Sequence, residues 1–320
     1  MQILITGSIA FDYLMSFPGH FKEHLLPEHL EKVSLSFLVD TLIKRRGGIA
    51  PNIAYTMALL GGQASVMGTA GSDFGEYGEW LTKQGVDISN IKVMDDKLTA
   101  SFFATTDQSN AQIASFFPGA MADAPSMSLR DIEQPPDLIL VSPNDPAAMD
   151  KVIKESNELG IPYIYDPSQQ IVRVDGETLM VGVESAHGMF ANEYEFELVK
   201  DKTGLSLKEI LGHLDFLVVT LGPKGAIVYH GEGEEYINAV PETQILDPTG
   251  GGDAFRGGFL TAYRHGLDWR ACGRAGALAA TFCLENEGPQ THYYTVENFV
   301  ERYKENFADD DSMSVLINSN

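Results

Sequence analysis

The sequence predicts an α/β fold, with a mostly parallel central sheet and helices on both of its faces. Two observations predict it. Short, almost wholly apolar runs recur through the chain, and amphipathic segments of helical period lie between them. Residues 137–141 and 216–220 are the clearest apolar runs. Parallel strands joined by helices are covered on both faces, which explains why they are apolar at nearly every position.

The individual elements follow from two periodicities. Ile49, Ile53, Met57 and Leu60 recur at helical spacing and form one apolar stripe. By the same reasoning, the predicted helices span residues 49–60, 74–84, 145–158, 206–213, 251–265, 269–285 and 295–306. The predicted strands span residues 2–6, 65–69, 137–141, 161–165, 187–191 and 216–220. The acidic end from residue 308 onward is expected to be frayed.

Two stretches interrupt this alternation. Residues 98–105 and 112–117 predict two strands around a short polar link, which is an antiparallel hairpin. Residues 13–43 contain aromatic, Pro and His residues and no βα pattern. We therefore expect a small antiparallel lid made of residues 13–43 and 98–118, and a large α/β domain made of residues 1–12, 44–97 and 119–320.

Composition restricts the classes of partner. The 320 residues contain 22 Lys and Arg against 45 Asp and Glu, a formal net charge of −23. No strongly basic run offsets this charge, so a nucleic-acid binder or a protein docked on anionic lipid is not expected. No apolar run approaches 18 residues, so no membrane span is expected. Cys272 and Cys283 are expected to lie about 16 Å apart on one helix as core residues, and the protein is expected to be cytoplasmic.

The most informative motif is a glycine loop before the helix at 251–265. Gly250, Gly251 and Gly252 allow the backbone to turn tightly and to point several N–H groups at an anion, and the helix dipole adds to the positive potential. Asp253 follows them, where a carboxylate can take a proton from a hydroxyl that attacks a phosphate. The local pattern also fits a glycine-rich loop with an aspartate that caps the helix.

Two further sites lie near the N-terminus. Gly47 and Gly48 begin the helix that contains Asn52, whose amide offers both a donor and an acceptor to a hydroxylated ligand. Asp12 follows the first strand, at the edge where open α/β sheets bind ligands, and could accept hydrogen bonds from a vicinal diol. Taken singly, these residues are better explained by a capped helix and a surface aspartate.

Four motifs in order resemble the ribokinase/PfkB family of carbohydrate and nucleoside kinases. Residues 47–52 and 247–253 resemble the two signatures of that family, 192–195 its N-x-x-E motif, and 220–225 its T-x-G-x-x-G turn. The resemblance implies a ribokinase-like three-layer α/β/α fold and transfer of a phosphoryl group from ATP. It also implies Mg²⁺ held through water by Glu195, K⁺ near Asp247 and a homodimer formed through the lid. The residues expected to contact the nucleotide are Asn192, Thr220, Gly222, Gly225 and Arg256.

Two features favour a nucleoside as the acceptor. Ile49 stands where sugar kinases of the family tend to have a lysine that binds sugar hydroxyls. Phe102 and Phe116 are expected to hold a purine between them. Within the family the sequence is most similar to adenosine kinases of the actinobacterial type. That resemblance implies that adenosine contacts Ser8, Asp12, Ser36, Gly48, Asn52, Phe102, Phe116, Gln170 and Asp253.

The expected reaction is ATP + adenosine → ADP + AMP, a step of purine salvage. Asp253 serves as the base, and the N–H groups from Gly250 to Asp253 hold the transferring phosphoryl. A broad purine nucleoside kinase or a sugar kinase of the same family is the first alternative, and a non-catalytic nucleoside-binding module is the second. A dinucleotide-dependent oxidoreductase is disfavoured, because the glycine cluster does not follow the first strand.

Overall fold

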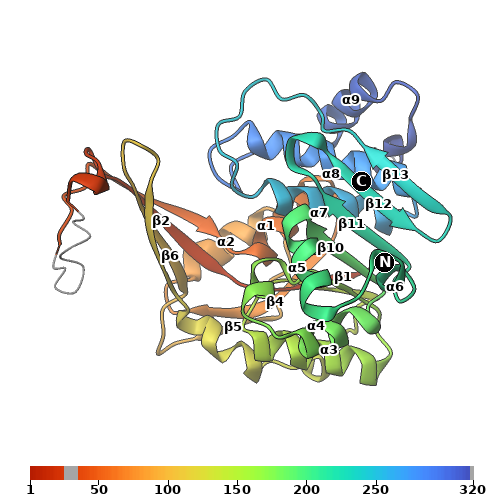
Figure 1. Cartoon of the computed structure of the whole chain (residues 1–320), viewed down its shortest axis with the longest axis horizontal. Coiled ribbons are helices and arrows are strands. Elements are labelled where there is room, and N and C mark those ends of the chain that lie inside the picture. Colours follow the sequence, from red (N-terminus) through yellow and green to blue (C-terminus); the bar gives the residue numbers. More distant parts are fainter. Residues whose placement is uncertain (25–34, 318–320) are drawn as a thin grey trace.

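The computed structural model describes residues 1–24 and 35–317. Its large domain is built on a nine-stranded sheet (Figure 1). In spatial order the strands are β13 (Gly233–Ile237), β12 (Ala226–His230), β11 (Phe216–Thr220), β10 (Gly188–Asn192), β9 (Tyr163–Tyr165), β8 (Leu138–Val141), β1 (Ile3–Thr6), β4 (Ala64–Gly71) and β5 (Ile91–Met94). All pairs from β11 to β5 are parallel, and β12 and β13 extend the sheet as antiparallel strands.

Side-chain alternation along these strands divides the core into two layers. Ile3 and Ile5 face one cluster of buried apolar residues, whereas Leu4 faces the other. The first cluster is covered by α1 (Ile49–Leu59), α2 (Gly75–Lys83), α7 (Gly251–Arg264), α8 (Trp269–Leu284) and α9 (Val296–Asn306). The second is covered by α3 (Pro146–Leu159), α4 (Gly176–Glu184), α5 (Glu193–Thr203) and α6 (Leu207–Leu211). The three-layer α/β/α prediction is therefore confirmed.

The lid is a separate four-stranded sheet that projects from one side of the large domain (Figure 1). Its order is β3 (Thr41–Gly47), β2 (Ala10–Ser16), β6 (Ala100–Thr106) and β7 (Gln112–Phe117). The outer pairs are antiparallel, and the central β2–β6 pair is parallel. The predicted boundaries after residues 12 and 43 fall inside β2 and β3. Residues 25–34 of the predicted lid lie outside the described part of the chain.

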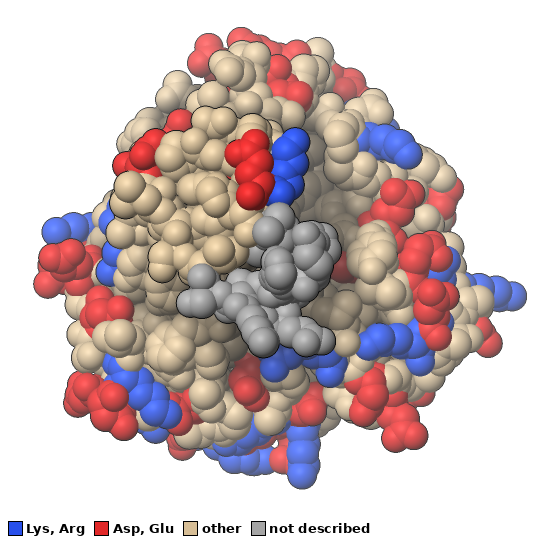
Figure 2. Space-filling view, turned by 60° about the vertical axis from the view of Figure 1, so that its left-hand side comes forward, with Lys and Arg blue, Asp and Glu red and all other residues tan. Residues whose placement is uncertain are grey.

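The face of the molecule on the lid side has mixed charge. Figure 2 shows Lys and Arg side chains scattered among Asp and Glu over this face, with no continuous basic surface. Among the described residues no helix is both long enough and apolar enough to cross a membrane.

Several predicted elements differ from the structure at their ends or were missed. The motif at 192–195 begins a helix, α5, that the periodicity did not indicate, because its apolar positions are few. The frayed end expected beyond residue 308 is wrong. A short 3₁₀ helix at Ser312–Leu316 buries Met313 and Leu316 against the core. Cys272 and Cys283 are buried free thiols on α8, as predicted.

Candidate active site

The glycine loop at the start of α7 forms the centre of the site. Gly250 is the residue before the helix and has a φ of +84°, a conformation that only glycine adopts without strain. A Cβ there would also lie 2.8 Å from the Cα of Pro289. The first N–H groups of a helix have no partner within it, so those that follow Gly250 are available to an anion. The loop has the geometry that the sequence predicts for a phosphate cradle.

Asp253 lies in the first turn of α7, and its carboxylate is held by the lid-proximal helix α1. The Asn52 Nδ2 donates a hydrogen bond of 2.8 Å to the Asp253 Oδ2. Burial raises the pKa of Asp253 to about 6, opposed by Arg256 and by the bond from Asn52. A carboxyl group with this pKa is ionised at neutral pH and basic enough to accept a proton there, which suits a general base.

Arg256 supports this loop from one turn further along α7. Its Nη1 donates to the carbonyl of Gly252 at 3.0 Å, and its Nη2 and Nε lie 2.7 Å and 2.5 Å from the two oxygens of Asp166. Both side chains are buried. The predicted role of Arg256 as a free phosphate contact therefore needs correction, because its guanidinium is committed to Asp166, a carboxylate at the end of β9, and to the loop backbone.

One row of side chains crosses the lid on a single face. Arg45, Asp12, Phe102 and Phe116 are register partners on β3, β2, β6 and β7, and partners in register project to the same side of a sheet. This face is turned toward the glycine loop, since Arg45 reaches Asp247 from it. Burial raises the pKa of Asp12 to about 6, opposed by Arg45.

The predicted purine sandwich does not fit this row. Directly opposed residues have Cβ atoms about 5 Å apart, whereas a base between two rings needs roughly twice the 3.5–4.0 Å contact distance. Phe102 and Phe116 therefore stand side by side and offer a platform for one face of a base. Phe116 is 47% exposed, which leaves its ring available.

The predicted residues around α1 come together beside Asp253. Gly48 precedes α1 with a φ of +92°, and a Cβ there would lie 2.5 Å from the carbonyl of Ser8. The Ser8 hydroxyl accepts a bond of 3.3 Å from the N–H of Ile49. Asn52 uses its Oδ1 as well, which accepts a bond of 2.6 Å from Gln290. Asn52 is thus a structural link to Asp253 and not only a potential ligand.

Gln170 and Ser36, two residues predicted to contact the substrate, differ in where they lie relative to the site. Gln170 lies in a 3₁₀ turn, Ser168–Val172, just after Asp166, and its buried Oε1 has no partner among the described residues. Ser36 is exposed and precedes the far end of β3, where Thr41 pairs with Ser16, four residues along β2 from Asp12. At about 3.3 Å per residue this end of the lid is more than 10 Å from Asp12. The structure does not bring Ser36 to the cluster.

A cavity of about 400 Å³ lies on the other side of the glycine loop. Three of the predicted nucleotide residues, Thr220, Gly222 and Gly225, line it together with Gly251 and Gly252. The cavity also has an apolar wall formed by residues of α7, α8 and the segment 239–248. The cavity therefore borders the loop that the sequence predicts to hold phosphate groups.

The N-x-x-E motif forms a capping box at the start of α5. The Asn192 Oδ1 accepts from the N–H of Glu195, and the Glu195 Oε2 accepts from the N–H of Asn192, both at 2.8 Å. In the described part of the chain no three His, Cys, Asp or Glu side chains gather as direct ligands of a metal. Mg²⁺ that keeps waters and phosphate oxygens as ligands would fit this arrangement, and Glu195 would be the carboxylate that holds those waters.

Asp247 does not fit a free K⁺ ion in this arrangement. Its Oδ2 lies 2.6 Å from the Nη1 of Arg45, and its Oδ1 accepts from the N–H of Thr249 at 2.9 Å. Arg45 and Asp247 are both largely buried, and Arg45 also lies 3.4 Å from Glu287. The guanidinium of a lid residue therefore occupies the carboxylate that the resemblance assigned to the monovalent cation.

Sequence reasoning missed four residues that build the site: Arg45, Tyr77, Asp166 and Gln290. Asp166 could have been suspected, because a carboxylate at the end of a buried strand needs a cation. Arg45 could have been suspected as a basic residue two positions before the first glycine pair. Nothing in the local sequence distinguishes Tyr77 or Gln290, since their roles depend on contacts across 30 and 238 residues.

The site combines a glycine loop at a helix start with a buried carboxylate, a nucleotide-sized cavity and a facing lid. These features together are typical of an enzyme that transfers a phosphoryl group to a hydroxyl. The model of the "pfkB family carbohydrate kinase" matches residues 11–295. The chain belongs to this family, and it is an ATP-dependent phosphotransferase with an alcohol acceptor. The prediction from the four motifs is confirmed.

Similar proteins cover nearly the whole chain. A nucleoside kinase of Methanothermobacter thermautotrophicus is 30% identical over 94% of this chain and 95% of its own length. A nucleoside kinase of Methanocaldococcus jannaschii is 28% identical over 94% and 96%. The structure of Burkholderia thailandensis nucleoside kinase in complex with inosine has a TM-score of 0.85 and 38% identity, and covers 96% of this chain and 98% of that one.

Proposed function

We propose that this chain is an ATP-dependent nucleoside kinase that phosphorylates the 5′-hydroxyl of adenosine to give AMP, a step of purine salvage. The observation on which this rests is the position of Asp253. It directly follows Gly252, which lines the cavity, and its carboxylate lies close enough to Asp12 of the lid row for the two charges to interact. The nucleoside kinases with which the chain aligns support a nucleoside acceptor. The aromatic platform supports a base as part of that acceptor.

The acceptor would lie across the lid face. Asp12 would accept hydrogen bonds from the ribose hydroxyls, near Gly48 and Asn52, and the base would stack on Phe102 and Phe116. A buried amide with an unpartnered oxygen, Gln170, is available to read the edge of the base. Ser36 would join these residues only if its segment moved toward the site.

In the transfer step, Asp253 accepts the 5′-hydroxyl proton while the 5′-oxygen bonds to the γ-phosphorus. The bond from the γ-phosphorus to the β–γ bridging oxygen breaks, and ADP leaves with that oxygen. The N–H groups after Gly250 hold the charge on the transferring group. Mg²⁺ bound to the nucleotide would neutralise phosphate charge. The lid excludes water, which would otherwise compete as acceptor.

A broader purine nucleoside kinase is the second candidate. A similar structure holds inosine, and the side-chain amide of Gln170 can present either its carbonyl or its NH₂ to a purine edge. Gln170 therefore does not by itself admit adenosine and reject inosine. A sugar acceptor gains no support, because Ile49 offers no hydrogen bond to a sugar hydroxyl.

The test is a panel of acceptors with Mg-ATP: adenosine, inosine, guanosine, cytidine, ribose and fructose. ADP is quantified together with the phosphorylated acceptor. We expect equimolar ADP and AMP from adenosine. Turnover of inosine and guanosine at similar kcat/KM would favour the broader enzyme. Turnover of ribose or fructose alone, or of no acceptor, would refute the proposal, and the latter would favour a nucleoside-binding module.

We also propose that two copies pair through the outer face of the lid. Leu42, Met15, Thr105 and Ile113 are register partners on the face opposite Asp12. Leu42 is 63% exposed and Ile113 is 42% exposed. Apolar side chains in a row on one face of a sheet gain stability when a second surface covers them.

A further inference from the structure

A chain of hydrogen bonds links Gly47, the last residue of β3, to the Asp253 carboxylate. The Tyr77 hydroxyl donates to the carbonyl of Gly47 at 2.9 Å, and the Gln290 Nε2 lies 2.6 Å from that hydroxyl and 2.6 Å from the Asn52 Oδ1. The Asn52 Nδ2 then donates to Asp253 at 2.8 Å. Tyr77, Gln290 and Asn52 are 1%, 4% and 6% exposed, so no solvent competes for these bonds.

Both ends of this chain can only accept hydrogen bonds. At one end is a backbone carbonyl, and at the other an ionised carboxylate. The single hydroxyl proton of Tyr77 is used on Gly47, so Tyr77 must accept from Gln290, and the NH₂ of Gln290 must point inward. The second proton of this NH₂ group is donated to Asn52. Asn52 must therefore turn its amide oxygen toward Gln290 and its amide nitrogen toward Asp253. Only one orientation of each amide gives every hydrogen bond of the chain both a donor and an acceptor.

We propose that Gln290 is a positioning residue that determines which end of the Asn52 amide faces Asp253. This inference rests on the proposed role of Asp253 as the base and names a residue that keeps it competent. Without the N–H groups of Gln290, the Asn52 oxygen loses its donor and the amide can rotate. Rotation would turn an amide oxygen toward the carboxylate, where two acceptors repel each other.

The effect can be followed through ionisation of Asp253. A donated hydrogen bond favours the ionised carboxylate, and an opposed oxygen disfavours it. Five other titratable groups interact electrostatically with this carboxylate. They are Arg256 on α7, Asp12 on β2, Glu195 on α5, Cys283 on α8 and Asp166 in the turn after β9. Gln290 contacts none of them by a hydrogen bond among the described residues, so its replacement changes the orientation of Asn52 and not these charges.

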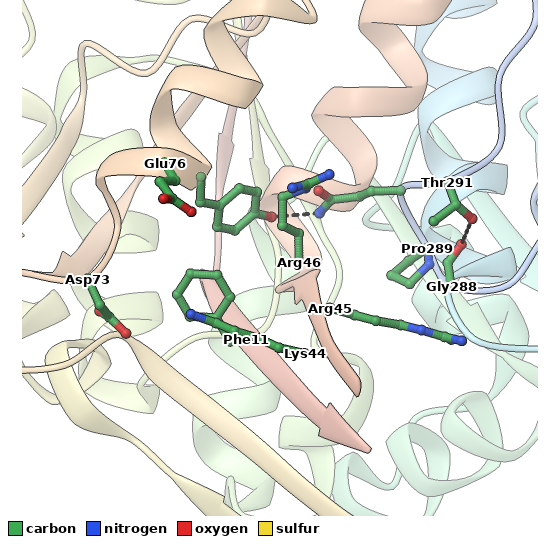
Figure 3. A pocket seen from close by; sticks show the side chains of 11 residues that line it. Phe11, Lys44, Arg45, Arg46, Asp73, Glu76, Gly288, Pro289 and Thr291 are labelled. Atoms are coloured by element: carbon green, nitrogen blue, oxygen red, sulfur yellow. Dashed lines mark hydrogen bonds between the residues drawn. The ribbon is translucent and has the colours of Figure 1, made fainter. Parts of the chain in front are cut away.

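The segment that supplies Gln290 also borders a second cavity, of about 320 Å³, behind the lid (Figure 3). Arg45 extends along this cavity toward Gly288, and Arg46 and Thr291 also line it. The Gln290 Oε1 has no partner among the described residues. This agrees with an amide whose orientation is dictated by its NH₂ group.

The experiment compares Gln290→Met, which removes both donors, with Gln290→Glu, whose carboxylate would demand the NH₂ of Asn52. The wild-type pH profile of kcat should fall on the acid side near pH 6. We expect that limb to move up by about one pH unit in Gln290→Met, which adds no charge and so reports the orientation of Asn52 alone. It should move further in Gln290→Glu, where repulsion by the new carboxylate adds to that effect. At pH 6 the rate would fall from about half to about a tenth of its plateau. Thr291→Val, whose hydroxyl bonds only to backbone carbonyls of its own loop, is the control.

A structural role alone predicts a different result. If the variants lower the melting temperature but leave the acid limb at the wild-type pH, or if Gln290→Glu behaves as wild type, the inference is wrong. The pair Gln290→Met and Asp253→Asn gives a readout that needs no acceptor. At pH 8, Asp253→Asn should stabilise the Gln290→Met protein more than the wild type, since ionisation of Asp253 is then less favourable. Equal effects would overturn the inference, even if the acceptor panel had failed.

Discussion

Replacing Asp253 by Asn should inactivate the enzyme and stabilise it. The variant keeps the shape of the side chain and an oxygen that can accept from Asn52. It loses the proton acceptor, so kcat should fall by about 10²–10⁴ while nucleoside binding is retained. The gain in stability follows from the buried charge, because burial raises the pKa of Asp253 from 3.8 to about 6.

The size and the sign of the stability change follow from the linkage between protonation of Asp253 and folding. A shift of about two units means that ionising Asp253 in the folded protein costs about 3 kcal/mol more than in the unfolded chain. That cost is fully present above pH 6 and nearly absent below pH 4, where the carboxyl is protonated in the folded state. Relative to wild type, Asp253→Asn should therefore gain about 3 kcal/mol at pH 8 and less than about 1 kcal/mol at pH 4.

Denaturant unfolding at both pH values measures this difference, and steady-state kinetics measures kcat. Asp201→Asn, at an exposed position of α5, is the control and should alter neither quantity. A variant that is equally stable or less stable at pH 8 would refute the account of the buried charge. Wild-type turnover by the variant would refute the assignment of Asp253 as the base.

Three further perturbations test the lid. Phe116→Ala should raise the KM for the nucleoside about tenfold and leave the KM for ATP within about twofold, because base stacking is worth about 1–3 kcal/mol; equal changes in steady-state kinetics would contradict the platform. Arg45→Met should make kcat depend on K⁺. The wild type should work equally well in Na⁺, because the Arg45 guanidinium already neutralises Asp247. Lys44→Met, which changes a residue on the opposite face of the lid, is the control, and K⁺ dependence of the wild type would disprove the reasoning. Leu42→Asp should convert a dimer to a monomer in light scattering, while Val172→Asp on the large domain should not, and a wild-type monomer would exclude pairing through the lid.

The local sequence is enough to predict those helices and strands whose apolar residues recur at regular spacing. The strand at Phe216–Thr220 is found where it is predicted. α1 begins directly after Gly48, and α7 begins at Gly251, within the glycine run. The lid strands β2 and β3 were not predicted, because they mix apolar with charged residues such as Asp12, Lys44 and Arg46. Which apolar and charged side chains of β2 and β3 share a face of the sheet is decided only when the strands pair.

The sequence by itself determined the family and the position of the glycine loop, because these depend on residue types at fixed short spacing; the proposal that Asp253 is the base starts from the same motif. Backbone conformation at Gly250 and the position of Asp253 in the first turn of α7 follow from neighbours in the chain. The tertiary structure alone decided that Arg256 pairs with Asp166, that Arg45 occupies Asp247 and that Gln290 orients Asn52. Each of these contacts joins residues 90 or more positions apart, and hydrogen-bond partners at that distance are selected by packing and not by spacing.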